Sequence, residues 1–248
     1  MALTSLEILT GSLSLVTVII STIIGLRIVS KYFTYKRREL LLVGFTWILL
    51  CEIWWSSAFS FLAAIITGKG FNPELYFTLG NIFVPVALIF WLTAYTDFLN
   101  KKNQKLIIII AAIVGLIYYI LFFYFIFNDV TVIGIMFNSV DAEYSPFAFG
   151  YLISVLVVFF ATGVNFARIS MKSENQEIKL KGKFLLLAVI LFTIGGALDG
   201  LKPYLFGAPQ ILNVVLIINR IILILSGIAF YSGFLLPRWI KELIIKTE

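Results

Sequence analysis

The side chain in this sequence that most clearly demands a chemical explanation is Arg220. It lies near the middle of segment 211–230, ILNVVLIINRIILILSGIAF, which is long and apolar enough to cross a bilayer. A guanidinium group inside lipid is unfavourable, so it normally faces the protein interior and has a partner there. Because arginine keeps its proton in proteins, the expected partner is a carboxylate.

Two acids lie inside other apolar segments at a similar depth. Glu52 is near the middle of segment 40–67, and Asp199 is in segment 184–206. Arg220 lies about ten residues from the end of its own segment, or roughly 15 Å deep at the rise of an α-helix. The spacing therefore predicts a buried network in which Glu52 and Asp199 surround Arg220. The alternative interpretation is a structural clamp that only fixes helix packing.

Three further polar residues belong to the same candidate network. Lys202 follows Asp199 by three residues, so the two share a helix face. Lys202 either pairs with Asp199, which leaves Arg220 for Glu52, or extends outward from the bundle. Asn213 precedes Arg220 by seven residues on the same face, and Asn219 is adjacent to Arg220.

Segment 75–99 carries a second candidate feature, Asn81 followed by Pro85. Proline has no N–H to donate to the carbonyl of residue 81, so we expect a kink with a spare acceptor. Such a kink can line a cavity, although kinks also occur without any ligand. The aromatic residues Trp55 and Phe59 share the helical stripe of Glu52, and with Trp91 they are expected either to wall an apolar pocket or simply to pack.

The composition defines the class of protein. The 248 residues are 61% hydrophobic and only 13% charged, whereas roughly 25% charged residues is usual for a soluble domain. Cys51 is the single cysteine, which excludes an intramolecular disulfide and a cysteine-based metal cluster. The chain has no histidine, the commonest metal ligand. We therefore expect a membrane protein with no metal site and no cofactor.

Apolar segments divide the whole chain into predicted helices. Seven membrane spans are expected, at 8–30, 40–67, 75–99, 106–127, 146–169, 184–206 and 211–236. Residues 1–248 form one all-α, seven-helix bundle, and the first span is expected to be retained, since no cleavable signal peptide is evident. Segment 130–137, VTVIGIMF, is either a short strand or interfacial, and 237–248 is an amphipathic cytoplasmic tail.

The basic residues predict the orientation of the bundle. Those flanking the spans concentrate on one face: Arg27, Lys31, Lys36, Arg37, Arg38, Lys101, Lys102, Lys105, Arg168, Lys172, Lys179, Lys181, Lys183, Arg238, Lys241 and Lys246. The loops of the other face have only Lys69 as a cation. The positive-inside rule then places the N-terminus outside and the C-terminus in the cytoplasm.

The same distribution indicates the partners and the location. Because the cations behind the net charge of +6 lie in loops between spans, they predict membrane topology and not nucleic-acid binding. They are also expected to contact anionic lipid. The expected location is the plasma membrane, most simply of a prokaryote, with the lipid bilayer as the first partner.

Several chemistries are disfavoured by what the sequence lacks. A retinal protein needs a lysine in the middle of its seventh helix, where this chain has Arg220, which is a poor nucleophile. The sequence has no GxSxG and no HExxH motif, so we expect no enzyme. A pair of catalytic acids at Glu52 and Asp199 is disfavoured because a neighbouring Arg220 would keep both carboxylates ionised.

Two segments resemble a known family. The first, WILLCEIWWSSAFSFL, is an aromatic-rich helix with a mid-span acid, and the second, VPVALIFWLTAYTDFLNKK, has a central proline and ends in Tyr95-Thr96. This pattern, over about residues 40–105, is similar to the seven-helix sensor region at the N-terminus of some bacterial and archaeal histidine kinases. The resemblance implies a receptor-like bundle that relays a signal to a cytoplasmic output domain. This chain ends at Glu248 without a kinase domain, so it would be a stand-alone sensor or would signal through a partner.

Three functions are compatible with these features. The first is a sensor-like membrane protein that binds an unknown small ligand at the buried charges. The second is a small-solute transporter with its site at the same midplane cluster. The third is a structural or lipid-binding membrane subunit. Solute flux through liposomes separates the second function from the first.

Overall fold

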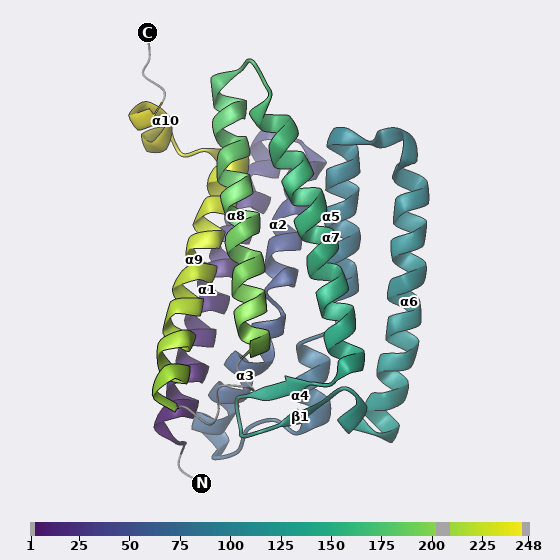
Figure 1. The fold of residues 1–248 in the computed structure, drawn as a ribbon, viewed down its shortest axis with the longest axis vertical. Helices are drawn as coiled ribbons and strands as arrows, with labels where there is room; N and C mark the ends of the chain where they lie inside the picture. Colours follow the sequence, from purple (N-terminus) through teal and green to yellow (C-terminus); the bar gives the residue numbers. More distant parts are fainter. Residues whose placement is uncertain (1–2, 202–208, 245–248) are drawn as a thin grey trace.

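Long helices stand side by side over most of the molecule, and a two-stranded sheet covers one end (Figure 1). The computed structural model describes residues 3–201 and 209–244. The helices of the described chain are α1 (Ser5–Tyr35), α2 (Arg38–Leu50), α3 (Ile53–Thr67), α4 (Pro73–Leu79), α5 (Val84–Leu99), α6 (Gln104–Asn128), α7 (Pro146–Met171), α8 (Gln176–Leu201), α9 (Pro209–Leu235) and α10 (Arg238–Ile244). Two short 3-10 helices, η1 (Lys101–Asn103) and η2 (Val130–Val132), flank α6.

The predicted all-helical membrane class agrees with this architecture. Six helical segments of the described chain are long and apolar enough to cross a bilayer. The count rises to seven if α2 and α3, which are bent by 56° at a short break, form one span. The predicted boundaries are close for α6 and α7. The predicted end of the sixth span at residue 206 lies outside the described residues.

Two predicted spans are wrong as continuous helices. Segment 40–67 is divided into α2 and α3 at Cys51–Glu52, and segment 75–99 is divided into α4 and α5 by a turn at residues 80–83. The first break consists of tight turns, in which Glu52 N–H donates to the Leu49 carbonyl and Trp54 N–H donates to the Cys51 carbonyl. Hydropathy did not predict either break, because the residues on both sides are equally apolar.

Local capping explains why two other helices are longer than predicted. α1 begins at Ser5 because Thr4 and Glu7 form a reciprocal capping box. α8 begins at Gln176, where the side chain of Asn175 accepts hydrogen bonds from the N–H groups of Glu177 and Ile178. The first turns of α8 are polar and basic, so hydropathy alone placed its start at residue 184.

The helices enclose one main core, and α6 stands at its edge (Figure 1). α1 packs on α2, α3 and α9, α8 packs between α7 and α9, and α5 contacts both α2 and α7. Because α5 reaches α7 directly, α6 is left outside this ring and packs mainly on α5. The buried residues of α6 form a single narrow stripe: Ala111, Gly115, Tyr118, Phe122 and Ile126. The rest of its surface is apolar and exposed, as expected for a helix that contacts lipid.

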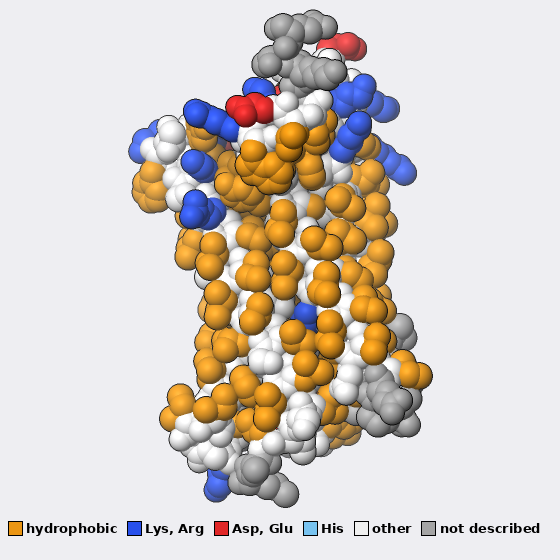
Figure 2. Space-filling model, turned by 90° about the vertical axis from the view of Figure 1, so that its left-hand side faces the viewer, with side chains coloured by type: hydrophobic (Ala, Val, Ile, Leu, Met, Phe, Trp, Pro, Cys, Tyr) orange, Lys and Arg blue, Asp and Glu red, His pale blue; other side chains and the backbone are white. Residues whose placement is uncertain are grey.

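Charge is distributed unevenly along the long axis. Figure 2 shows Lys and Arg side chains gathered at the end that carries α10, above a wide belt of hydrophobic side chains. α1 begins at the opposite end from α10 (Figure 1). The predicted amphipathic tail is helical over Arg238–Ile244, and residues 245–248 lie outside the described chain.

A β-hairpin covers the other end of the bundle, beside α4 (Figure 1). Strand β1 (Gly134–Met136) pairs antiparallel with β2 (Ala142–Tyr144), so the strand alternative for segment 130–137 is confirmed for these three residues. The hairpin loop is bonded to α1, α3 and α4, and in α3 the hydroxyl of Ser60 donates to the carbonyl of Ser139. The hydroxyl of Tyr76 donates to the carbonyl of Val140 at 3.1 Å, and the N–H of Ser139 donates to Glu7 Oε1 at 3.1 Å. These bonds hold the acidic strand β2 against the helix ends.

Candidate functional site

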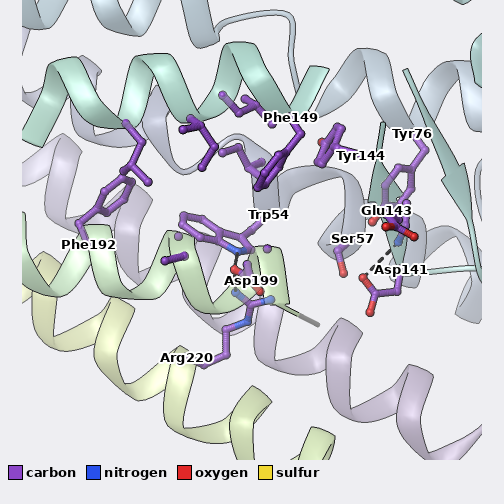
Figure 3. A pocket seen from close by; sticks show the side chains of 18 residues that line it. Trp54, Ser57, Tyr76, Asp141, Glu143, Tyr144, Phe149, Phe192, Asp199 and Arg220 are labelled. Carbon is purple, nitrogen blue, oxygen red and sulfur yellow. Dashed lines mark hydrogen bonds and ion pairs between the residues drawn. The ribbon is translucent and has the colours of Figure 1, made fainter. Parts of the chain in front are cut away.

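A cavity of about 470 Å³ lies under the hairpin, between α3, α7, α8 and α9 (Figure 3). Its walls are mainly apolar, and the hydrophobic side chains of Phe149, Leu152, Leu156 and Phe192 contribute to them. Tyr76, Asp141, Glu143 and Tyr144 form a polar region near the hairpin, while Trp54, Asp199 and Arg220 form another region deeper in the bundle. The volume is within the range of cavities that bind small molecules.

Arg220 and Asp199 form the buried ion pair in the deeper region. Arg220 Nη1 lies 3.0 Å from Asp199 Oδ2, and only 2% of the Arg220 side chain is exposed. Trp54 Nε1 donates to the same carboxylate oxygen at 2.6 Å, and the guanidinium lies 5.6 Å from the centre of the Trp54 ring. Arg220 Nη2 also donates to Ser14 Oγ at 3.4 Å. The pair therefore links α1, α3, α8 and α9 at one point.

The predicted position of Glu52 beside Arg220 is wrong. Glu52 is fully buried, and both of its carboxylate oxygens lie 2.8 Å from the backbone nitrogen of Phe83. The N–H groups of Ile82 and Val84 also interact with this carboxylate. Glu52 thus accepts from the N–H of Phe83 at the start of α5, which is the positive end of that helix. Because a closer set of donors satisfies it, it is not available to Arg220.

Asn81 lies in the turn between α4 and α5. This turn divides the span into two helices and is not a simple proline kink. The carbonyl of Asn81, predicted to be spare, accepts from the N–H of Val84 at 3.4 Å. The exposed carbonyl of Ile82 in this turn accepts from the hydroxyl of Tyr119. Pro85 lies in the first turn of α5, where its missing N–H leaves no bond unmade. The sequence signal was correct about a disturbed helix, but the result is a new helix start.

The side chain of Asn81 connects this break to the cavity. Asn81 Nδ2 donates to the Phe77 carbonyl at 2.8 Å and lies 3.2 Å from the hydroxyl of Tyr144, which lines the cavity. Its Oδ1 accepts from the hydroxyl of Tyr118 at 3.1 Å. A hydrogen-bonded chain therefore runs from the cavity wall to the α4–α5 break and on to α6.

The aromatic walls predicted from the sequence are also wrong. Trp55 packs edge-on against Phe59 and Phe83, and Phe59 is 38% exposed. Trp91 is buried in the main core, where its Nε1 donates to Thr162 Oγ1 at 2.7 Å. The cavity is instead lined by the neighbouring Trp54. The prediction assumed that Glu52, Trp55 and Phe59 lie on one face of a continuous helix. That assumption fails because a new helix, α3, begins directly after Glu52.

Two of the three remaining predicted polar residues lie in the described chain, and neither joins the ion pair. Lys202 lies outside the described residues. Asn213 is exposed, because the buried stripe of α9 at this end passes through Leu212 and Leu216. Asn219 is buried against Gly195 of α8, and its side-chain amide has no hydrogen-bond partner within the described chain. Neither asparagine is among the described residues that line the cavity.

Sequence reasoning missed most of the wall near the hairpin. Tyr76, Asp141, Glu143 and Tyr144 lie in or beside connections that were predicted only as loops. One signal was present for the opposite wall. Gly196 and Gly200 are one helical turn apart, and both line the cavity on α8. A methyl group added at Gly196 would lie 3.2 Å from Leu156 of α7, so these glycines keep the wall open.

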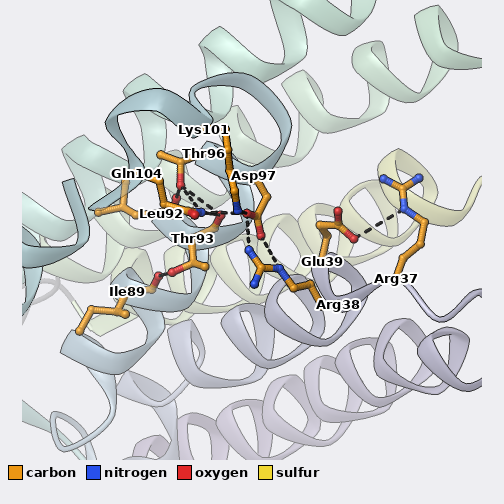
Figure 4. A network of polar contacts seen from close by, with 10 residues as sticks. All are labelled: Arg37, Arg38, Glu39, Ile89, Leu92, Thr93, Thr96, Asp97, Lys101 and Gln104. Atoms are coloured by element: carbon orange, nitrogen blue, oxygen red, sulfur yellow. Dashed lines mark hydrogen bonds and ion pairs between the residues drawn. The ribbon is translucent and has the colours of Figure 1, made fainter. Parts of the chain in front are cut away.

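A second polar network joins α2, α5, η1 and α6 at the basic end of the bundle (Figure 4). Arg38 at the start of α2 forms a bidentate contact with Asp97 of α5. Its Nε donates to Asp97 Oδ2 at 2.9 Å, and its Nη2 donates to Asp97 Oδ1 at 2.5 Å. Lys101 Nζ and Gln104 Nε2 also donate to Asp97, at 2.5 and 2.8 Å. These contacts of Asp97 fix the end of α5 to the start of α2.

The described residues contain no group of three or more His, Cys, Asp or Glu side chains arranged to hold a metal ion. Comparisons with protein-family models, with curated proteins and with solved structures found no match to this chain.

Proposed function

We propose that this chain is a seven-span integral membrane sensor. In this proposal α2 and α3 form one span, the hairpin end faces outward with the N-terminus, and α10 lies in the cytoplasm. A small amphipathic ligand binds in the cavity under the hairpin, and its occupancy changes the cytoplasmic end of the bundle. A signalling partner in the membrane or cytoplasm reads that change, as in the kinase sensor regions that the sequence resembles.

The nature of the cavity supports an amphipathic ligand. Apolar side chains from α7 and α8 provide most of the wall, so the body of the ligand would be apolar. The ion pair of Asp199 and Arg220 and the hydroxyl of Ser57 provide polar contacts in the interior. The Ser57 side chain is 6% exposed, and its Oγ has no hydrogen-bond partner among the described residues. A ligand polar group near Ser57 would satisfy that hydroxyl.

The observation that carries the proposal is the bond between Tyr144 and Asn81. Tyr144 lines the cavity, and Asn81 forms part of the break at which α5 begins. A ligand that displaces Tyr144 would disturb this break, whose N–H groups are held by Glu52. α5 then extends to Asp97, which is bonded to Arg38 at the basic end. A rigid helix can transmit a shift of this kind, provided that it has two arrangements.

Filling the cavity by substitution tests this proposal without a known ligand. Gly196→Leu would place a side chain in the cavity beside Leu156, whereas Gly150→Leu adds the same group at an α7 position with no atom within 4 Å. Spin labels at Lys102→Cys and Lys172→Cys, in a Cys51→Ala background, would report the distance between the basic ends of two helices. We expect Gly196→Leu to shift the distance distribution and Gly150→Leu to leave it unchanged. Identical distributions in both variants would contradict the proposed relay.

The two helix breaks also support a second candidate, a small-solute transporter. Discontinuous helices that meet near the membrane midplane are a common feature of transporter binding sites. Here the α2–α3 break and the α4–α5 break meet through Glu52 and Phe83. A transporter would use these breaks as hinges to open the cavity alternately to each side. Flux measurements, described in the Discussion, distinguish it from the sensor.

A further inference from the structure

A second hollow, of about 490 Å³, lies at the basic end, where the turn from α7 to α8 meets α10. Its charged lining consists of three lysines, Lys172, Lys179 and Lys183, against one acid, Glu174. Met171, Leu180 and Ile244 provide apolar parts of its wall. The hollow shares no lining residue with the ligand cavity.

The three lysines of this hollow are unpaired in the described chain, unlike their neighbours. No carboxylate lies within 4.0 Å of their ammonium groups among residues 3–201 and 209–244. In contrast, Lys181 and Lys241 both contact Glu177, at 2.8 and 2.7 Å. Lys179 and Lys183 are four residues apart on α8, so they are neighbours on one helix face and repel each other. A bound anion would relieve that repulsion.

The surroundings of the hollow favour an anion that carries an apolar chain. α10 is fixed beside α8 by the Lys241–Glu177 contact and by packing of Leu236 and Ile240 on Leu180. On its other face α10 exposes Trp239 by 63% and Leu243 by 74%. Exposed aromatic and aliphatic residues next to basic ones are typical of a helix lying in a membrane interface. The hollow therefore opens where the headgroups of a bilayer would lie.

We propose that this hollow binds the phosphate of an anionic phospholipid headgroup. Lys172, Lys179 and Lys183 contact the phosphate, and the acyl chains extend along the apolar side chains of the rim. Basic hollows between helices at a membrane surface bind lipid headgroups by this combination of charge and apolar contact. The site would tie the short α7–α8 turn and α10 to the membrane. It is independent of the ligand cavity and of the sensor proposal.

Thermal unfolding of the full chain in detergent tests the lipid site. Added phosphatidylglycerol should raise the unfolding midpoint, whereas phosphatidylcholine should not. The variant Lys179→Gln/Lys183→Gln should need about tenfold more phosphatidylglycerol for the same rise, since each lysine contributes to the attraction. The matched control is Lys102→Gln/Lys105→Gln, which removes two exposed charges from another loop at the same end of the bundle. It should respond as the unaltered chain does.

Three outcomes would overturn the proposal. An equal loss of response in both double variants would indicate a general attraction of the basic surface for lipid. An equal midpoint rise with phosphatidylcholine, whose choline cation balances its phosphate, would show that the net negative charge of the headgroup is not recognised. A full rise with glycerol 3-phosphate alone would show that the hollow binds soluble phosphate and not a lipid.

Discussion

The carboxylate of Glu52 caps the start of α5 by accepting from the N–H of Phe83, whose nitrogen lies 2.8 Å from each carboxylate oxygen. Each residue lies at an interruption of its own span, so the two interruptions meet. In lipid, unsatisfied backbone groups are strongly unfavourable, and broken helices persist only where protein groups bond to them. The negative charge of Glu52 at the positive end of α5 adds to that stabilisation.

Removing this acceptor should destabilise the protein. Glu52→Ala leaves buried N–H groups at residues 82–84 without their carboxylate, and we expect a loss of about 1–3 kcal/mol in the free energy of unfolding. Glu52→Gln keeps one carbonyl acceptor and should lose less. Unfolding by increasing fractions of sodium dodecyl sulfate in mixed micelles measures both changes. Glu242→Gln, at an exposed position of α10, is the control and should be neutral.

Amide hydrogen exchange gives a second measure of the same break. The N–H of Phe83 should exchange faster in Glu52→Ala, whereas amides in the middle of α8 should not change. If the alanine variant were as stable as the unaltered chain and equally protected at Phe83, the capping role of Glu52 would be wrong.

Both the success and the failure of the sequence analysis can be traced to Glu52. Hydropathy and the rarity of charge in apolar segments selected Glu52 and Arg220, which are buried, and Asp199, whose side chain is 14% exposed. The partners could not be selected in the same way, because depth along a helix does not fix rotation about its axis. The bend at Cys51–Glu52 changed that rotation for the whole of α3, so Trp54 reached Asp199 while Trp55 turned toward Phe83.

The hairpin explains the larger part of what the sequence did not predict. Its strands contain only three residues each, too few for a clear alternation of polar and apolar side chains. Tyr144 gains its role only through the fold, which brings it to Asn81, 63 residues earlier in the chain. Contacts of this kind depend on tertiary packing and have no local signature.

The Asp199–Arg220 pair should show strong energetic coupling. Because the pair is buried, Arg220→Leu alone removes a cation that contacts Asp199 and should destabilise the protein by about 3–5 kcal/mol. Asp199→Leu/Arg220→Leu removes both charges and should recover much of that loss. A double-mutant cycle measured by unfolding should therefore give a coupling energy well above that of surface pairs.

The same experiment distinguishes the two acids. A cycle on Glu52 and Arg220 should be additive within about 0.5 kcal/mol, since the two side chains share no hydrogen-bond partner in the described structure. Strong coupling between Glu52 and Arg220, together with weak coupling between Asp199 and Arg220, would contradict the arrangement of the cavity.

The Arg38–Asp97 contact should respond to salt in a way that the buried pair does not. The Arg38 side chain is 58% exposed, so solvent screens its charge, although the carboxylate of Asp97 is only 5% exposed. We expect Asp97→Asn to lower the free energy of unfolding by about 1 kcal/mol or less. The difference from the unaltered chain should shrink between 50 mM and 1 M NaCl. The matching variant Asp199→Asn should show a difference that salt leaves nearly constant.

Solute flux decides between the sensor and the transporter. Proteoliposomes incubated with a mixture of radiolabelled amino acids, sugars and organic cations should show no uptake above that of protein-free liposomes if the protein is a sensor. A transporter would show uptake of at least one class, and Arg220→Ala should abolish it by removing the ion pair at the cavity. Gly196→Leu should block such uptake by filling the cavity, whereas Gly150→Leu should leave it intact. Uptake that follows this pattern would replace the sensor by the transporter, because a relay through Tyr144 and Asn81 requires no passage of solute.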